Sequence, residues 1–417
     1  MIAGLSFFGL MALGLPLAFA MIAAAWVLIH EGGNPLLMQG FAQQLFAGIE
    51  TPAMLTLPLF ILLGEVMGAS GIGRRLLRLA EALLPPLRAG LAQVNLLCNL
   101  MMASVLGSTV AQLTVMSRLA VPEMERAGYP RETAATVTAA GALLAPVLPP
   151  SMNLIVFAAV AQLPVADLFR AAILPGLAIA LAFVLVIAWT GRRENLPHSG
   201  RLSRRERLGA IRQGLPGLLV PVTAIGTIMT GIATPTEAAA FATLAALGIG
   251  GLNGDLRPRA LPGVLSRTAV TSGVVLYLVA AAQVVAWVLT FSNVPQLAAN
   301  WIENVAGSPL MFLLLLNLLL LVLGTVLEPI PAIILTAPVL LPVATGVFGI
   351  DPLAFGVILC ANLALGLLTP PVGAGLYTAA LMTGVSPGRL SWRLAPYFIA
   401  VLAVIAGLSV LTALAAS

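Results

Sequence analysis

Residues Leu310–Pro329 read LMFLLLLNLLLLVLGTVLEP. The run from Leu310 to Leu323 is almost continuously apolar, and it lacks the alternation of polar and apolar residues that a membrane β-barrel strand needs. The sequence then changes to Gly324-Thr325 and Glu328-Pro329, which favours a break in the helix. We therefore predict a helical hairpin over Pro309–Gly346 that turns within residues 324–329.

The rest of the chain has the same apolar character. Of its 417 residues, 60% are hydrophobic and 8% are charged, whereas soluble domains carry about 25% charged residues. A soluble fold cannot hide so much apolar surface, so a lipid bilayer is the expected solvent. Backbone polar groups must be satisfied locally inside lipid. We therefore predict an all-α polytopic membrane protein.

The amino-terminal segment and the cysteines fit this class. Met1–Ile29 lacks the basic start and the cleavage site of a signal peptide, and we expect it to remain as a membrane span. Alternatively, Gly14-Leu15-Pro16 divides it into two short helices, and the side of its amino terminus stays open. Cys98 and Cys360 lie far apart in apolar runs, which favours free buried thiols over a disulfide or a metal pair.

The arginines indicate the topology. All 20 basic residues are arginine, and they lie mostly in short stretches between apolar segments. The net charge of +5 alone would also fit a nucleic-acid-binding protein. The positions of the arginines between apolar segments instead indicate that they orient the chain in the membrane. The strongest cytoplasmic mark is the predicted loop 191–213, which carries Arg192, Arg193, Arg201, Arg204, Arg205, Arg207 and Arg212.

Two further arginine clusters flank the apolar stretch Leu91–Ser117. A single crossing would put them on opposite sides, so two cytoplasmic clusters require the stretch to enter the membrane and turn back near Ser104–Ser108. No arginine occurs between Arg267 and Arg389, so both ends of the hairpin Pro309–Gly346 should face the periplasm. One re-entrant hairpin then enters from each side, as in an inverted repeat.

Two proline pairs support the repeat. Pro149-Pro150 and Pro370-Pro371 each end an apolar run. Each pair removes two backbone donors and disfavours helical geometry in the residue before it, which should break a membrane helix at mid-depth. Interrupted segments at corresponding positions of two halves are the best sequence indication of a transporter's binding site.

Broken helices and hairpin turns expose carbonyls for a hard cation and N–H groups for a carboxylate. We predict two equivalent Na⁺ sites beside one anion site. The cation residues are Ser104, Gly107, Pro150, Gly324, Thr325, Gly366, Thr369 and Val372. The substrate residues are Ser108, Thr109, Ser151, Asn153 and Glu328. Alternatively, the small residues only allow close helix packing; for Glu328, cation coordination, substrate contact and tip structure all stay open.

Other residues favour structural roles. Glu237 follows Thr234-Pro235-Thr236 and is expected to serve a helix start, and Glu65 is expected to lie at an interface or between helices. The sequence contains no phosphate-binding loop, so ATP should not drive the chain directly. An intramembrane enzyme would need paired acids or a nucleophile with a base at membrane depth, and no such pair stands out. We predict that the chain is not an enzyme.

Several short motifs follow one another along the chain in a specific order. They are LPLFILLGE at 57–65, the Gly107-Ser108 tip, Pro122-Glu123-Met124 with Ala127-Gly128-Tyr129, LPPS at 148–151, Leu174-Pro175-Gly176, GIATPTEAA at 231–239, Gly349-Ile350-Asp351-Pro352, and Asn362-Leu363 through Gly366 to TPPVG at 369–373. Each motif is weak alone, but in this order and spacing they resemble the large membrane subunit of the TRAP (tripartite ATP-independent periplasmic) transporters over nearly the whole chain.

The resemblance implies an elevator-type importer in the bacterial inner membrane, driven by two or more Na⁺ ions. It also implies a small membrane subunit, a periplasmic substrate-binding protein and an organic acid substrate such as a C4-dicarboxylate or sialic acid. Scaffold helices are expected at 1–88 and 214–306, and transport-domain segments at 89–190 and 307–417. A stand-alone ion-coupled organic-anion permease of the wider superfamily is the alternative.

This sequence departs from the family pattern at three positions. The family's first tip usually reads Ser-Gly-Ser, whereas Leu106 stands before Gly107-Ser108 here. Glu328 stands where the family usually has Asp, and Arg118 replaces a residue that is often small. Leu106 removes one hydroxyl from the predicted first Na⁺ site, so an altered substrate or altered coupling is a further possibility.

Overall fold

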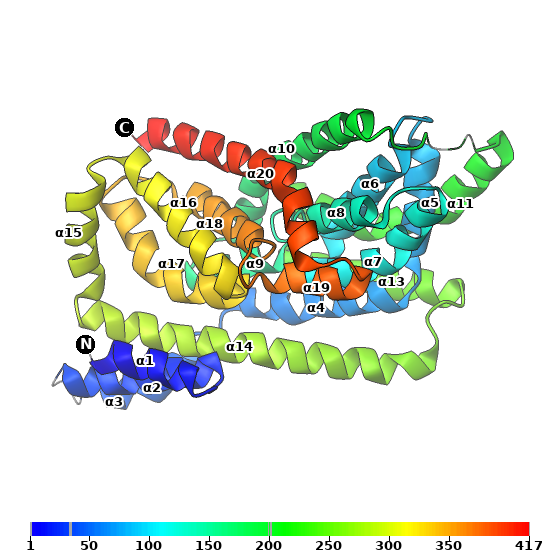
Figure 1. Ribbon diagram of the computed structural model, residues 1–417. Coiled ribbons are helices and arrows are strands. Elements are labelled where there is room, and N and C mark those ends of the chain that lie inside the picture. The colour runs from blue at the N-terminus through cyan, green and yellow to red at the C-terminus, as the bar shows by residue number, and fades with distance from the viewer. Residues whose placement is uncertain (1, 33–35, 199, 201, 417) are drawn as a thin grey trace.

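The computed structural model describes residues 2–32, 36–198, 200 and 202–416, and Figure 1 shows an assembly of helices. These ranges contain no β-strand, and one isolated bridge pairs Arg88 with His198. Seven helical segments among the described residues are long and apolar enough to cross a membrane, and a bent pair would make an eighth. The predicted all-α polytopic class is confirmed.

The first predicted hairpin is present as α6 (Gly90–Leu106) and α7 (Thr109–Arg126), which pack on each other. Gly107 ends α6 with a φ of +59°, a left-handed conformation that glycine adopts without a Cβ clash. Helix α7 does not stop at Ser117, where we predicted the apolar stretch to end. It continues because Ala120, Val121 and Met124 keep helical spacing on its buried face.

The second hairpin is also present, with bounds that match the prediction. Helix α16 (Pro309–Val326) leads to the tip residues Leu327 and Glu328, and α17 (Pro329–Gly346) leads away from them. Both helices begin with proline, whose fixed φ suits the first helical position and whose missing N–H is not needed there.

Both predicted helix breaks occur. Helix α8 (Arg131–Ala142) is separated from α9 (Met152–Val160) by turns and a cis Pro149–Pro150 bond. Helix α18 (Pro352–Gly366) is separated from α19 (Ala374–Thr383) by turns and a cis Pro370–Pro371 bond. The two halves of the chain thus repeat the same order of hairpin and broken helix.

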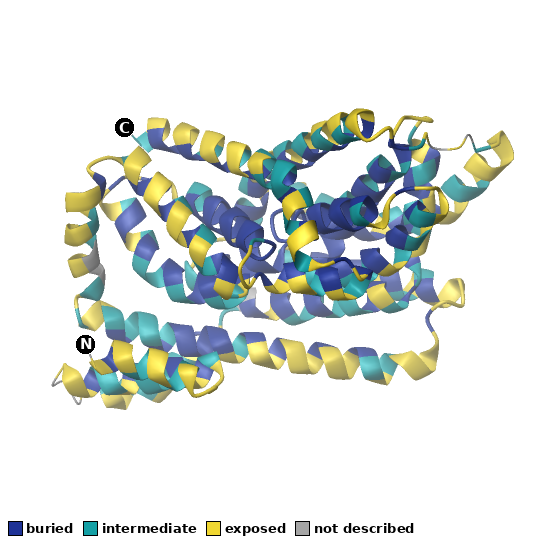
Figure 2. Ribbon diagram, viewed as in Figure 1, coloured by how far each residue is buried: buried dark blue, intermediate teal, exposed yellow. Residues whose placement is uncertain are grey.

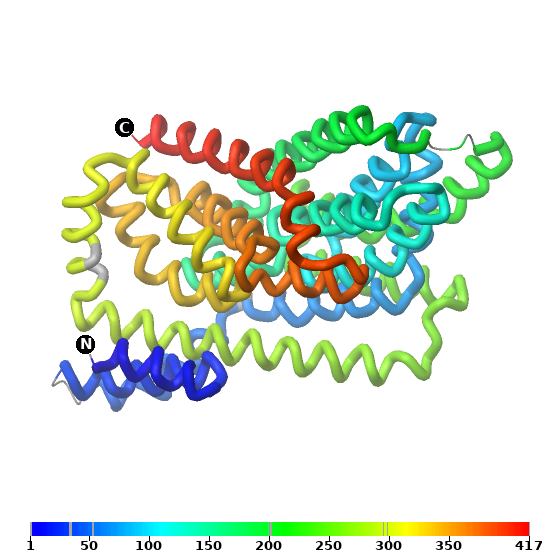
Figure 3. Tube along the Cα trace, viewed as in Figure 1, coloured from blue at the N-terminus to red at the C-terminus, as the bar shows by residue number. Residues whose placement is uncertain are grey.

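The repeats interlock at the centre of the molecule. Helix α7 packs on α8 and also on α19, while α17 packs on α18 and also on α9. Figure 3 shows the cyan and orange parts of the chain meeting there. Helices α8, α9 and α18 consist almost wholly of buried residues (Figure 2). The two breaks are therefore enclosed by protein, as irregular backbone at membrane depth requires.

Buried amides join each hairpin to its own broken helix. Asn99 of α6 lies against Gly141 of α8, where a Cβ would approach the amide nitrogen to 2.7 Å. Asn317 of α16 accepts a 2.8 Å hydrogen bond from the amide of Asn362 in α18. Gly141 and Asn362 each lie eight residues before a proline pair. In an apolar solvent such polar contacts help to hold helices together.

A second group of helices lies along one side of the breaks. Helix α4 (Pro52–Ala69) packs on both α13 (Pro235–Leu252) and α14 (Leu261–Phe291), and α14 runs along the lower side in Figure 1. The carboxylate of Glu65 accepts from Arg267 at 2.7 Å, which confirms the expected interhelical role. Glu237 forms a capping box with Thr234, as expected for a helix start.

The other helices complete the assembly. Helices α1 and α2 pack together beside α14 (Figure 1), and α10 packs along α20. Their bounds are α1 (Ile2–Ala12), α2 (Leu17–Glu31), α3 (Leu37–Ala47), α5 (Ile72–Leu83), α10 (Val165–Arg193), α11 (Arg204–Pro221), η1 (Val222–Gly226), α12 (Thr227–Met229), η2 (Pro258–Ala260), α15 (Val294–Ala306) and α20 (Pro387–Ala416).

Two predicted boundaries are wrong. The segment 1–29 is divided at Gly14, which has a φ of +84°, so the single span is replaced by the two-helix alternative; Met1 lies outside the described residues. The predicted loop 191–213 is helical up to Arg193 and again from Arg204. Ser203 and Glu206 form a capping box that starts the second helix there. Arg201 lies outside the described residues.

The topology predicts one-sided labelling at Gly200. This residue is exposed, and a Cβ there would meet no atom within 4 Å. We expect Gly200→Cys to react with a membrane-impermeant maleimide only when the reagent reaches the cytoplasmic face. Cys98 and Cys360 are free and buried, so the parent protein should give little background. Labelling of intact cells from the periplasm would contradict the predicted orientation.

Candidate functional site

At the first break, the backbone around Pro150 and Met152 lies against the first hairpin tip at Gly107. A Cβ on Gly107 would lie 3.1 Å from the backbone nitrogen of Met152 and 3.3 Å from the carbonyl oxygen of Pro150. Only glycine allows the tip to approach the break so closely. Ser104 is buried near this tip, and its hydroxyl donates to the carbonyl of Met101 at 2.8 Å. The structure thus gathers Ser104, Gly107 and Pro150 in one region.

The second break meets the second tip through two glycines. A Cβ on Gly366 would lie 2.5 Å from the Cα of Gly324, and a Cβ on Gly324 would lie 3.0 Å from the Cα of Gly366. Across the same contact, Gly373 donates its N–H to the carbonyl of Thr325 at 2.8 Å. The two hydroxyls donate along their own helices, Thr325 to Val322 and Thr369 to Leu365. Their oxygen lone pairs are left to accept a cation.

Val372 is an exposed residue of the second predicted cation site, and it has an apolar side chain. Its side chain is 48% exposed and offers no ligand atom, so only its backbone carbonyl is suited to a cation. It follows Pro371 directly in the turn between α18 and α19. The residues predicted for the second site thus lie in α16, at the end of α18 and in the turn that follows α18.

A cavity of about 360 Å³ lies between the first break and the two tips. Ser108, Thr109, Asn153 and Glu328, four of the five predicted substrate residues, line it. Ser151 does not. It is fully buried as the N-cap of α9, where its hydroxyl donates to Pro146 at 2.6 Å and accepts from the N–H of Leu154. Its position indicates a structural role in the break.

Three helices begin at this cavity. Thr109 is the first residue of α7, Met152 of α9 and Pro329 of α17, and all three line the cavity. Helix amino termini present free N–H groups and the positive end of the helix dipole. Three such termini can attract an anion even where no arginine is present. Among the described residues, no arginine lines this cavity.

Two polar atoms beside the cavity have no hydrogen-bond partner among the described residues. They are the hydroxyl oxygen of Thr109 and the amide nitrogen of Asn153. The two residues are only 3% and 5% exposed. Leaving a buried polar group unpaired costs about 1–3 kcal/mol, so such groups call for an explanation. Both residues line the cavity at which the three helices begin.

The fourth wall of the cavity was not predicted from the sequence. Helix α14 supplies Val270, Thr271, Val274, Val275 and Leu278 to the cavity. These residues belong to a long apolar helix that continues unbroken through Gly273, so periodicity alone cannot distinguish a cavity wall from a lipid-facing surface. The cavity thus lies between the broken helix, both hairpin tips and the outer helix α14.

Nearly the whole chain, residues 5–414, matches one family model, described as the DctM component of the tripartite ATP-independent periplasmic transporters. The chain belongs to this family. The resemblance drawn from the sequence motifs is thereby confirmed, and the protein is a multi-pass inner-membrane transporter subunit, not an enzyme.

Curated members of the DctM family align over most of their length. The C4-dicarboxylate TRAP transporter large permease DctM of Pseudomonas aeruginosa is 35% identical, over 85% of this chain and 83% of its own. The sialic acid TRAP large permease SiaM of Vibrio cholerae is 32% identical, over 95% and 93%. The 2,3-diketo-L-gulonate TRAP large permease YiaN of Escherichia coli is 34% identical, over 88% and 86%.

Among solved structures, the YdaH transporter of Alcanivorax borkumensis has a similar fold. The TM-score is 0.67 at 16% sequence identity, over 91% of this chain and 88% of that one. A likeness at this identity concerns the fold alone. It supports the overall helical fold described above.

Proposed function

We propose that this DctM-family chain imports a small organic anion across the inner membrane together with Na⁺. The observation that carries the proposal is the cavity where α7, α9 and α17 begin between the two hairpin tips. Helix amino termini and the unpaired amide of Asn153 suit a carboxylate. The three relatives described above are named for organic acids, which fits this ligand class.

Charge balance supports coupling to a cation. Glu328 lines the cavity, and no basic residue does so among the described residues. An anionic substrate would therefore approach another carboxylate, which is unfavourable in a partly desolvated site. Na⁺ bound at each tip by carbonyl and hydroxyl oxygens would offset this repulsion. Substrate and Na⁺ would then bind together more tightly than either alone, as coupled transport requires.

The packing supports an elevator mechanism. The hairpins and broken helices, within segments 89–190 and 307–417, interlock through α7, α19, α17 and α9. We propose that they move as one body against a scaffold formed by segments 1–88 and 214–306. The α14 wall of the cavity belongs to the scaffold. Movement would therefore separate the substrate from α14 and open the cavity to the other side.

Family membership implies a tripartite system, and we propose that a small membrane subunit and a periplasmic binding protein serve this chain. Proteoliposomes containing both membrane subunits should take up substrate only with the loaded binding protein and an inward Na⁺ gradient. Uptake that persists after Na⁺ is equilibrated would contradict Na⁺ coupling. Uptake by the large subunit alone would favour the stand-alone permease instead.

Thr369→Val tests the second proposed Na⁺ site. The change removes one oxygen and keeps the shape of the side chain. A lost hydrogen bond or ligand of this kind costs about 1 kcal/mol, so the apparent Na⁺ affinity should fall roughly fivefold while expression stays similar. The Na⁺ dependence of uptake is the measurement.

Thr345→Val is the matched control. Thr345 also donates to the carbonyl four residues earlier, at 3.0 Å, but it lies near the far end of α17 from the tip. Its replacement should leave the Na⁺ dependence unchanged. If both variants shift the Na⁺ dependence equally, or neither does, Thr369 is not a ligand.

A further inference from the structure

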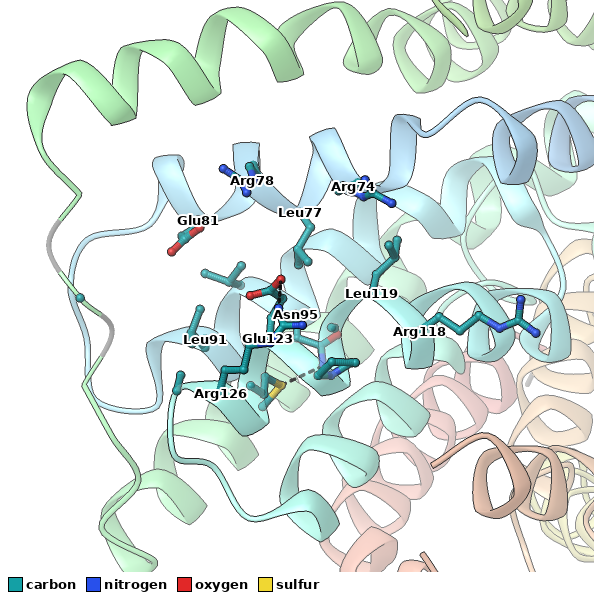
Figure 4. A pocket seen from close by; sticks show the side chains of 16 residues that line it. Arg74, Leu77, Arg78, Glu81, Leu91, Asn95, Arg118, Leu119, Glu123 and Arg126 are labelled. Carbon is teal, nitrogen blue, oxygen red and sulfur yellow. Dashed lines mark hydrogen bonds and ion pairs between the residues drawn. The ribbon is translucent and has the colours of Figure 1, made fainter. Parts of the chain in front are cut away.

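A second cavity lies away from the breaks, between α5 and the first hairpin. Its volume is about 740 Å³. Figure 4 shows Arg74 and Arg78 on α5, across from Glu123 and Arg126 on α7. Exposed Gly200, from the segment between α10 and α11, also lines it. By the arginine distribution, this is the cytoplasmic side of the membrane.

The cavity has an excess of positive charge. Arg74, Arg78, Arg118 and Arg126 line it together with Glu81 and Glu123, so four positive and two negative side chains leave a net charge of +2. Arg126 pairs with Glu123 at 3.0 Å. Within the part of the chain that the structure describes, Arg74, Arg78 and Arg118 have no ion pair. The Arg118 side chain points away from Arg74 and Arg78 (Figure 4), so two guanidinium groups, both on α5, are available to one anion.

The lining also has an apolar component. Leu77 of α5, Leu91 and Val94 of α6, and Leu119 and Met124 of α7 lie between the charged residues. Arginine binds phosphate oxygens through paired N–H donors. Basic pockets between helices on the cytoplasmic side suit the head groups of anionic lipids, whose glycerol and acyl carbons need apolar contacts.

We infer that this cavity is a binding site for a phosphate-bearing anion, held by Arg74 and Arg78 of α5. The phosphate of an anionic phospholipid and a free cytoplasmic phosphate share this chemistry, and the mixed lining favours the lipid. The site is separate from the proposed transport cavity, because the two have no lining residue in common.

Native mass spectrometry of the full chain, purified in detergent and titrated with phosphatidylglycerol, tests the inference. The double variant Arg74→Ala, Arg78→Ala should bind phosphatidylglycerol about 25-fold more weakly, since each arginine near an anionic surface contributes about fivefold. Inorganic phosphate, titrated in parallel by thermal shift, distinguishes a soluble ligand from the lipid. Phosphatidylcholine, which has no net charge, serves as the control lipid and measures binding that does not depend on lipid charge.

The control removes the same charge elsewhere on the predicted cytoplasmic side. Arg257 and Arg259 are exposed and do not line this cavity, so their double alanine variant should bind phosphatidylglycerol like the parent. Loss of phosphatidylglycerol or phosphate binding in the cavity variant alone supports the site. Equal loss in both variants, or no loss in either, overturns it. Size-exclusion profiles of both variants show whether the fold is intact.

Discussion

Replacing Gly366 with alanine should reduce uptake strongly. The new Cβ would lie 2.5 Å from the Cα and 2.6 Å from the carbonyl carbon of Gly324. Both are backbone atoms that no rotamer change can move, so the second tip must shift away from the break. Overpacking of this kind costs about 1–3 kcal/mol, which corresponds to roughly a 5- to 150-fold loss of the closed tip. Initial uptake rates in proteoliposomes are the measurement.

Gly248→Ala is the matched control for this change. Gly248 lies within α13, and a Cβ there would meet no atom within 4 Å. Alanine is favoured over glycine in a helix by up to about 1 kcal/mol, so this variant should be as stable as the parent or slightly more so, with normal uptake. Normal uptake by Gly366→Ala would show that the close contact of the two glycines is not needed for transport.

Replacing Asn153 with leucine should separate binding from stability. The two side chains are similar in size, and the Asn153 amide nitrogen has no hydrogen-bond partner among the described residues. Removing an unpaired buried donor should leave thermal stability unchanged or raised. If this amide donates to the substrate carboxylate, its loss costs about 1.5–3 kcal/mol, so uptake at low substrate concentration should fall roughly 10- to 150-fold.

Thermal unfolding and the substrate dependence of uptake should be measured together for Asn153→Leu. Asn304→Leu serves as a comparison, because Asn304 is exposed on α15 and donates only to the carbonyl of Asn300 at 2.8 Å. Its uptake should match that of the parent. A loss of stability in Asn153→Leu without a change in substrate dependence would assign Asn153 to packing and remove it from the site.

Much of the fold could be predicted from local signals. The apolar runs imply helices, because in lipid only helices and closed β-barrels satisfy all their backbone polar groups, and these runs lack the alternation of barrel strands. Pro149-Pro150 and Pro370-Pro371 mark both breaks, and the residues 104–108 and 324–329 contain both tips. These signals depend on short stretches of chain, so they can be read without knowing which segments meet.

Boundaries set by competing local effects were harder to predict. The arginines from 204 onward suggested a polar loop, yet the capping box at Ser203 and Glu206 starts a helix among them. Similarly, Arg118 and Arg126 lie on α7 because its opposite face is apolar and buried. A count of charges shows which side of a membrane a segment prefers, but it does not show whether the backbone there is helical.

The sequence by itself determined the solvent, the helical class, the two hairpins and the two breaks. Only the tertiary structure decided which of their residues share a site. It assigned Ser108, Thr109, Asn153 and Glu328 to one cavity, Ser151 to capping and the apolar residues of α14 to the fourth wall. The physical reason is that proline, glycine and charge act on their own few residues. The cavity instead depends on segments that lie between Gly107 and Leu367, far apart in the sequence. No short stretch of sequence shows which of these segments will pack together.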